Sequence, residues 1–302
     1  MSAIDALISQ ADVRGSLDLR CLFQGDWAVE HEQEGDGVAP YHIVLAGQCW
    51  VQLPDGVRIK LAAGDILVLP NGASHILRGD ASEALIRLPR PVGRGLLPVR
   101  MIGNGSEVDL ICGRFVYQRE SILFSGLPTH LIIPGSTFDQ TGPLSALVQL
   151  IRDEVDNERL AAQFMVNALT SALFALVIRA HLNQSPQVEG TLALLSDKRL
   201  SRAWEAILEA PEHDWNIDTL ADLANMSRAS FMRAFSKRSG SSPWAMLTKV
   251  RMEIAYGLLR RTNKGLNDIA AQVGYNSQAA FSKVFKTTYG SPPGLIRRGP
   301  TA

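Results

Sequence analysis

The segment from Asp268 to Lys286, DIAAQVGYNSQAAFSKVFK, decides the fold of the C-terminal third of the chain. A short aliphatic run comes first, a brief break follows, and Ser277 then stands where a second helix needs an N-cap. Phe281 and Phe285 are four residues apart, so they share one helix face and are expected to anchor the helix to a core. Gly290 and the following Ser-Pro predict where this helix ends. The segment therefore predicts a helix, a tight turn and a second helix.

The same pattern occurs once more, fifty residues earlier in the chain. Ser227 stands at the N-cap position, and Gly240 stands at the helix stop. Phe231 and Phe235 repeat the aromatic pair. An amphipathic helix predicted from Pro243 to Arg261 joins the two copies, so the C-terminal third is predicted to be an all-α domain with two helix-turn-helix units.

With the aromatic pairs turned inward, the opposite face of each second helix is exposed and basic. The exposed residues are expected to be Arg228, Ala229, Met232, Arg233 and Lys237 in the first unit, and Gln278, Ala279, Ser282, Lys283 and Lys286 in the second. Arg and Lys can donate to guanine, Gln can recognise adenine, and small residues allow close approach to thymine methyls. These faces predict two recognition helices for double-stranded DNA. The alternative is a solvated basic face in some other helical domain.

Charge is unevenly divided along this chain of 302 residues, although its net charge is zero. The segment from Asp197 to Ala302 holds 16 basic and 9 acidic residues, and the rest of the chain has the opposite imbalance. A basic C-terminal part beside an acidic N-terminal part favours a polyanionic partner for the former. Chance segregation of charge is the alternative interpretation.

Residues from about Leu200 to Arg298 resemble the AraC/XylS-type DNA-binding domain, through both repeats and the sequence Tyr289-Gly-Ser-Pro-Pro. The resemblance implies a transcription regulator, with an activator expected, whose partners are promoter DNA, RNA polymerase and a second copy of the chain. It places the base-reading positions at Ala229, Met232, Arg233, Gln278, Ala279, Ser282 and Lys283.

The N-terminal half is predicted to be a β-barrel. Short β-type runs cover Tyr41–Ala46, Gln48–Leu53, Ile66–Leu69 and Leu110–Tyr117, with turn residues between them. The stretch Gly64–His75 resembles the second cupin motif in its spacing of Gly, Pro, Gly and His. The stretch Tyr41–Gly47 resembles a degenerate first motif.

Two histidines make this barrel a candidate sensor. The first motif keeps only His42 where metal-binding cupins have a His-x-His pair and a following Glu, and the second motif supplies His75. A metal site usually needs three or more N, O or S ligands. His31, Glu32 and Cys49 are further candidates, so a divalent metal cofactor stays open. The alternative is a barrel whose histidines donate hydrogen bonds within the core.

Three cysteines give the barrel a second possible signal. Cys21 is predicted to open a strand in a segment with Arg14 and Arg20, where nearby cations favour a reactive thiolate. Cys49 and Cys112 are predicted to be small buried hydrophobes. By resemblance to regulators with this barrel, Cys21 is the candidate oxidant sensor, and a small-molecule effector in the barrel is the alternative.

Two helices are predicted between the halves, at Pro143–Val155 and Leu160–Leu182. The second is apolar on nearly all sides, but Gln163 and Arg179 interrupt it, which favours a buried helix over a membrane span. Such a helix needs more than one partner surface. The resemblance favours a homodimer seam, and packing on the barrel alone is the alternative.

The whole sequence therefore predicts an α+β chain with a cupin-like sensor domain at 1–135, a helical dimerisation segment at 136–185, a linker at 186–198 and a DNA-binding domain at 199–302. The predicted protein is a cytoplasmic, sequence-specific regulator and no enzyme, since no signal peptide is apparent and an odd number of cysteines fits a reducing compartment. A metal-dependent cupin enzyme with an accessory DNA-binding domain is the rival interpretation, and a nucleoid-binding protein is a third.

Overall fold

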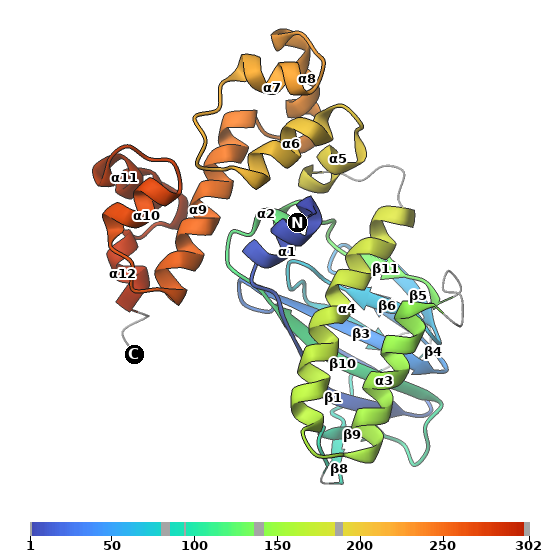
Figure 1. Cartoon of the computed structure of the whole chain (residues 1–302). Coiled ribbons are helices and arrows are strands. Elements are labelled where there is room, and N and C mark those ends of the chain that lie inside the picture. The colour runs from blue at the N-terminus through green and yellow to red at the C-terminus, as the bar shows by residue number, and fades with distance from the viewer. Residues whose placement is uncertain (1, 80–84, 94, 136–141, 185–189, 299–302) are drawn as a thin grey trace. The chain divides into compact units, whose positions relative to one another are not determined.

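A computed structural model describes residues 2–79, 85–93, 95–135, 142–184 and 190–298 (Figure 1). The chain divides into two compact units. The barrel unit comprises Val13–Tyr117 and Pro128–Pro186, and the helical unit comprises Met1–Asp12, Gln118–Leu127 and Gln187–Ala302.

The described residues of the barrel unit form two β-sheets and two helices. A seven-stranded sheet has the order β11-β6-β3-β10-β1-β9-β8, and a four-stranded sheet has the order β2-β7-β4-β5. The strands are β1 Arg14–Phe23, β2 Ala28–His31, β3 Val38–Ala46, β4 Gln48–Gln52, β5 Arg58–Ala62, β6 Ile66–Val68, β7 His75–Arg78, β8 Arg90–Val92, β9 Val99–Ile102, β10 Val108–Val116 and β11 Leu131–Ile133. The helices are α3 Pro143–Asn157 and α4 Ala162–Gln184. The predicted cupin-like β-domain followed by helices is confirmed.

The core of the barrel lies between the two sheets. Phe23 from β1, Val51 from β4 and Leu77 from β7 belong to one buried apolar cluster. Outside this core, α3 and α4 lie along the seven-stranded sheet (Figure 1). The N–H of Gly15 donates to the hydroxyl of Ser171 at 3.0 Å, and a Cβ at Gly15 would lie 2.5 Å from the backbone of α4. Glycine therefore lets strand β1 and helix α4 approach closely.

The helical unit contains the two predicted helix-turn-helix repeats. Its helices are α1 Ala3–Gln10, α2 Ile122–Ser125, α5 Gly190–Ser196, α6 Leu200–Glu209, α7 Ile217–Leu223, α8 Arg228–Ser239, α9 Pro243–Arg261, α10 Leu266–Gln272, α11 Gln278–Tyr289 and α12 Pro293–Arg298. Helices α7 and α8 form the first repeat, and α10 and α11 form the second. The connecting helix α9 has the predicted bounds.

Local capping explains where the second helix of each repeat begins and ends. The Ser227 and Ser277 hydroxyls accept the backbone N–H three residues ahead, which confirms both N-caps. Gly240 and Gly290 end the helices with φ of 71° and 70°, a region that favours glycine. All four phenylalanines of the aromatic pairs are fully buried.

The observed division of the chain differs from the predicted domain boundaries. Helix α5 occupies part of the predicted linker 186–198, of which 186–189 lie outside the described residues, as do 136–141 at the predicted start of the helical segment. Helices α3 and α4 belong to the barrel unit, whereas residues 1–12 and 118–127 belong to the helical unit. The reason is tertiary, because α5 docks on α2 through a 3.0 Å hydrogen bond from the Thr191 hydroxyl to the Ile122 carbonyl.

Candidate functional site

Helix α8 presents the predicted face of the first repeat. Arg228, Ala229, Arg233 and Lys237 are exposed, and Met232 is partly exposed. The Arg228 guanidinium forms a 3.1 Å ion pair with the Asp218 carboxylate at a site where both side chains are mostly exposed. Surface pairs of this kind contribute little to stability, so Arg228 can exchange its partner for a phosphate.

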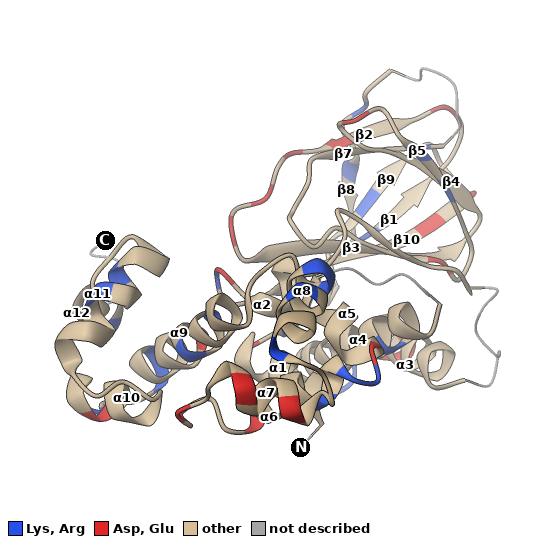
Figure 2. Ribbon diagram, turned by 90° about the horizontal axis from the view of Figure 1, so that it is seen from above, with Lys and Arg blue, Asp and Glu red and all other residues tan. Residues whose placement is uncertain are grey.

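Helix α11 presents the matching face of the second repeat. Gln278, Ala279, Lys283 and Lys286 are exposed, and Ser282 is partly exposed. Figure 2 shows Lys and Arg on both α8 and α11. Because Phe281 and Phe285 hold the inner face of α11 in the core, as the aromatic pair of the first repeat does in α8, the two outward faces lie at equivalent registers.

An arginine on the connecting helix supports the second repeat. The Arg251 guanidinium donates to the carbonyl oxygens of Pro211, His213 and Gly274 at 2.7, 2.9 and 3.1 Å. It also lies 5.7 Å from the ring centroid of Tyr275. Gly274 is the turn residue between α10 and α11, with φ of 79°. Arg251 therefore fixes the turn that orients α11, a role that the sequence patterns do not indicate.

A buried carboxylate on α9 holds the segment that follows strand β10. Glu253 is 1% exposed, and its Oε2 accepts the Ile122 N–H at 3.1 Å. The side-chain amide of Gln118 donates to the Glu253 carbonyl at 2.9 Å. Burial raises the pKa of Glu253 to about 7. No sequence motif indicated this residue.

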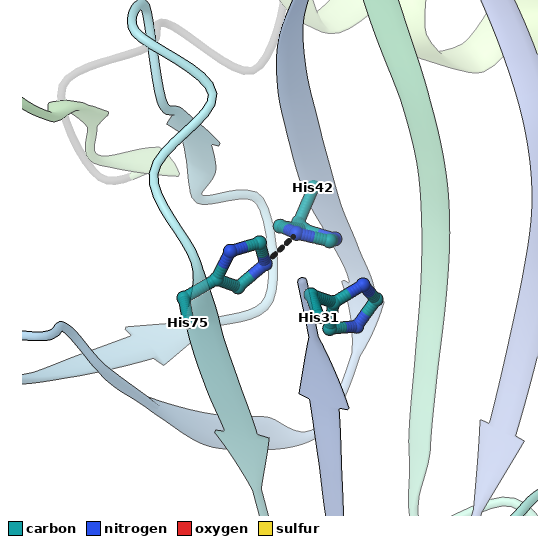
Figure 3. Close-up of side chains that lie close together, drawn as sticks. All are labelled: His31, His42 and His75. Atoms are coloured by element: carbon teal, nitrogen blue, oxygen red, sulfur yellow. Dashed lines mark hydrogen bonds between the residues drawn. The ribbon is translucent and has the colours of Figure 1, made fainter. Parts of the chain in front are cut away.

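The barrel interior brings three histidines together (Figure 3). His42 comes from β3 in the seven-stranded sheet, and His75 and His31 come from β7 and β2 in the four-stranded sheet. The Nε2 atoms of His42 and His75 are 2.8 Å apart, and one ring nitrogen from each histidine lies within 4.8 Å of the others. His42 and His75 are buried, and His31 is partly exposed. Of the further ligands considered from the sequence, only His31 joins the described cluster.

The rings of this cluster are held in their neutral form. Burial lowers the pKa of His31 to about 4, lowers that of His42 well below its usual value, and also lowers that of His75. The backbone carbonyl of Ala73 accepts a hydrogen bond from the Nδ1–H of His75 at 2.9 Å, so Nε2 of His75 is the unprotonated ring nitrogen and carries the lone pair. Neutral imidazoles of this kind are hydrogen-bond partners and metal ligands.

All three thiols are buried. Cys112 lies opposite His42 across β10 and β3, with its sulfur 3.0 Å from His42 Nδ1. A hydrogen bond with Cys21 and burial raise the pKa of Cys112, and burial raises that of Cys49 to about 12. The sequence predicted that Cys21 opens a strand, but Cys21 lies near the end of β1.

Arg20, the residue before Cys21, forms ion pairs with two carboxylates. The Arg20 guanidinium contacts Asp109 at 2.7 Å and Asp156 at 2.6 Å. Adjacent residues in a strand point to opposite faces, so the charge of Arg20 lies away from the core that holds Cys21. The oxidant-sensing role of Cys21 stays a prediction.

Helix α4 leaves large apolar side chains uncovered near its start. Four apolar side chains of this helix are buried in the barrel unit: Leu173, Phe174, Val177 and Ile178. The barrel is therefore one of the partner surfaces that the sequence predicted for this helix. Near its start, Leu160, Phe164 and Met165 are 100%, 73% and 40% exposed. By length and composition α4 could also cross a membrane, a test that the core helix of a water-soluble protein passes too.

Two family models cover most of the chain. The model described as Cupin matches residues 3–183, and the model described as Helix-turn-helix domain matches residues 220–299. Both agree with the resemblances noted in the sequence.

Several relatives match this chain over nearly their whole length. An HTH-type transcriptional regulator of Haemophilus influenzae is 36% identical over 99% of each chain. The HTH-type transcriptional regulator MtrA of Neisseria gonorrhoeae is 33% identical over 99% of this chain and 98% of that protein. An AraC-like transcription regulator of Streptomyces lividans is 30% identical over 100% of this chain and 99% of that protein. These relatives are regulators, which favours a DNA-binding regulator over a cupin enzyme. The chain belongs to the family of AraC-type helix-turn-helix transcriptional regulators that carry an N-terminal cupin domain.

Proposed function

We propose that each chain reads one DNA site through two recognition helices, α8 and α11, placed in successive major-groove segments about 34 Å apart. The observation that carries this proposal is the matched exposure of Arg233 and Lys283 at equivalent positions of the two repeats. Ala229, Met232, Gln278, Ala279 and Ser282 complete the base-reading faces. Arg228, Lys237 and Lys286 supply cations for phosphates or bases.

We further propose that the regulator is a homodimer and that α4 forms the seam. The exposed apolar start of α4, with Phe164 and Met165, is self-complementary in chemistry, so a second copy of this chain is the partner that covers it. Gln163 and Asn167, which are exposed and joined by a hydrogen bond of 3.0 Å, border this patch. Dimerisation would place two DNA-binding parts on one operator and raise the affinity by linkage.

The barrel is the proposed sensor of a small-molecule or oxidant effector. The regulator is expected to act in the cytoplasm, where its promoter lies, and to activate transcription through contact with RNA polymerase. The family resemblance supports activation, and the buried polar cluster between the sheets supports sensing in the barrel.

Selection of bound sequences from a random duplex pool tests the proposal. The full chain is expected to enrich one motif and to bind it at least about 10³-fold more tightly than a scrambled duplex at physiological salt. Equal affinity for both duplexes would contradict sequence-specific regulation and would instead indicate a nucleoid-binding protein.

A further inference from the structure

We propose that His31, His42 and His75 bind one divalent first-row transition-metal ion, and that this ion is the signal to which the regulator responds. The signalling part rests on the proposed function. The binding site itself does not.

The three histidines form a site that the motif pattern alone does not contain. The cupin-like motifs supply His42 and His75, whereas His31 comes from strand β2 and lies directly opposite His75 in the β2–β7 pairing. The site therefore joins both sheets, with one ligand from the seven-stranded sheet and two from the four-stranded sheet. Figure 3 shows the three rings gathered at one point in the barrel.

The donor atoms are close to coordination geometry. The Nε2 atoms of His42 and His75 are 2.8 Å apart. Tetrahedral coordination at about 2.0–2.1 Å would place them about 3.3 Å apart, a shift of about 0.5 Å. The His31 ring is stacked on that of His75 at a centroid distance of 4.6 Å. Rotation about the soft ring torsion of a partly exposed histidine can turn one nitrogen towards the shared point.

Supporting contacts prepare these donors. His75 Nδ1 donates to the Ala73 carbonyl, so its Nε2 presents a lone pair. Without an ion, His42 must therefore carry its proton on Nε2 and donate a hydrogen bond from there to His75 Nε2. Its Nδ1 then accepts a hydrogen bond from the Cys112 thiol. With an ion on Nε2, the His42 proton moves to Nδ1 and is donated to the Cys112 sulfur, at a contact of 3.0 Å. The thiol proton of Cys112 then turns to Cys21, with which it already shares a hydrogen bond. The number of protons on these groups does not change.

The donor set defines the class of ion. Three imidazole nitrogens with no carboxylate in the described cluster suit Zn²⁺, Cu²⁺, Ni²⁺ or Co²⁺, whereas Ca²⁺ and Mg²⁺ require oxygen ligands. Three protein ligands leave room for one further small ligand.

Chain continuity connects the site to the helical unit. Cys112 lies on β10, which ends at Val116, and Gln118 two residues later donates to the Glu253 carbonyl on α9. A change in the hydrogen bond between His42 and Cys112 therefore acts on strand β10. The segment that follows β10 is hydrogen-bonded through Gln118 to α9, the helix that joins the two recognition units.

Titration of the metal-stripped full chain with Co²⁺ tests the site. The wild type is expected to bind one Co²⁺ per chain, with visible absorption bands of four-coordinate Co²⁺ that Zn²⁺ removes. His31→Gln and His75→Gln are each expected to weaken binding more than the roughly 10–100-fold that loss of a supporting residue costs. His130→Gln, a histidine of the same unit outside the cluster, is the control and should bind as the wild type does.

Thermal unfolding measures metal binding in proteins that keep all three histidines of the cluster. Zn²⁺ should raise the midpoint of thermal unfolding of the wild type and of His130→Gln. Absence of both the bands and this shift in the wild type would overturn the site, as would unchanged Co²⁺ bands in both His31→Gln and His75→Gln.

The effect of the ion on DNA binding is measured separately. Saturating Zn²⁺ is expected to change the affinity of the wild type for its selected duplex by at least about fivefold, with no change in His31→Gln. An ion bound at the histidines with an unchanged affinity would overturn the signalling claim alone. Selective DNA binding without Co²⁺ binding would overturn the metal site and leave the proposed function standing, whereas Co²⁺ binding without selective DNA binding would do the reverse.

Discussion

The carboxylate of Glu253, on the helix between the two recognition units, accepts the backbone N–H of Ile122 at 3.1 Å. Ile122 lies in the chain between barrel strands β10 and β11, yet it belongs to the helical unit. Burial of this carboxylate outweighs its hydrogen bonds with the Ile122 N–H and the Ser121 side chain in setting its pKa. The helical unit therefore contains a buried ionisable group whose charged form is incompletely compensated by its neighbours.

Protonation of Glu253 should stabilise the fold. Its pKa is about 7 in the folded chain and 4.5 ordinarily, so the folded state holds the proton more tightly. The contribution of Glu253 to the free energy of unfolding should therefore fall as pH rises through this window, by about 3 kcal/mol in all. The buried histidines of the barrel, whose pKa values are lowered, contribute with the opposite sign, equally in the wild type and in a Glu253 variant. Nearby Tyr289 has a pKa raised mainly by burial, so it stays neutral throughout this window.

Glu253→Gln removes this contribution, so the free energy of unfolding of the variant relative to that of the wild type should rise between pH 5 and pH 8, as measured by calorimetry of the full chain. The variant should gain most over the wild type at pH 8. Glu205→Gln, at an exposed position of α6, is the control and should keep the wild-type slope. An identical slope in Glu253→Gln and the wild type would show that Glu253 is not the titrating group.

The recognition faces make a second prediction. Arg233→Ala and Lys283→Ala should each weaken binding to the selected duplex by about 1–3 kcal/mol, and binding to scrambled DNA by less, because a base contact is lost. Lys198→Ala removes an exposed cation outside α8 and α11 and should affect both duplexes slightly and alike. Equal losses on both duplexes for Arg233→Ala and Lys283→Ala would identify phosphate contacts instead.

The third prediction concerns the exposed apolar side chains at the start of α4. Phe164→Asp should convert the dimer to monomers in analytical ultracentrifugation, because a charge would be placed within the seam. Affinity for the operator should fall by roughly 10²-fold as the linked second site is lost. Asn183→Asp introduces the same charge at the exposed far end of α4 and should remain dimeric. A dimeric Phe164→Asp would assign the seam to another surface.

The fourth prediction concerns the order in which the three cysteine thiols react with an oxidant. Burial raises the pKa of Cys49, and a hydrogen bond with Cys21 together with burial raises that of Cys112. Because the thiolate forms of these two residues are therefore rare, Cys21 should be modified first. Limited hypochlorite treatment of the folded chain, followed by mass spectrometry, measures the order. A reporter response to hypochlorite should persist in Cys49→Ser and be lost in Cys21→Ser. Persistence in Cys21→Ser would exclude Cys21 as the sensor.

Local features of the fold could be predicted from the sequence because local residues determine them. Ser227, Ser277, Gly240 and Gly290 set helix ends through contacts a few residues away, and the bounds of α9 follow from Pro243 onwards. Aromatic spacing likewise predicted the buried faces of α8 and α11.

Non-local pairing could not be predicted in the same way. His31 became a candidate ligand on residue type alone, and only the register of β2 with β7 sets it opposite His75. The docking of Gln118 and Ile122 on Glu253 depends on tertiary packing that no motif encodes. The opposite orientations of Arg20 and Cys21, in contrast, follow from strand alternation and were available from the sequence.

The central claim is that one chain reads two adjacent major-groove segments through α8 and α11. Methylation interference on the selected duplex measures this most directly, because a methyl group on guanine N7 blocks contacts in the major groove. We predict, for each protomer, two clusters of interfering guanines about one helical turn apart on the same face of the duplex, with Arg233→Ala losing one cluster and Lys283→Ala losing the other. A single cluster per protomer, or interference unchanged in both variants, would contradict the claim.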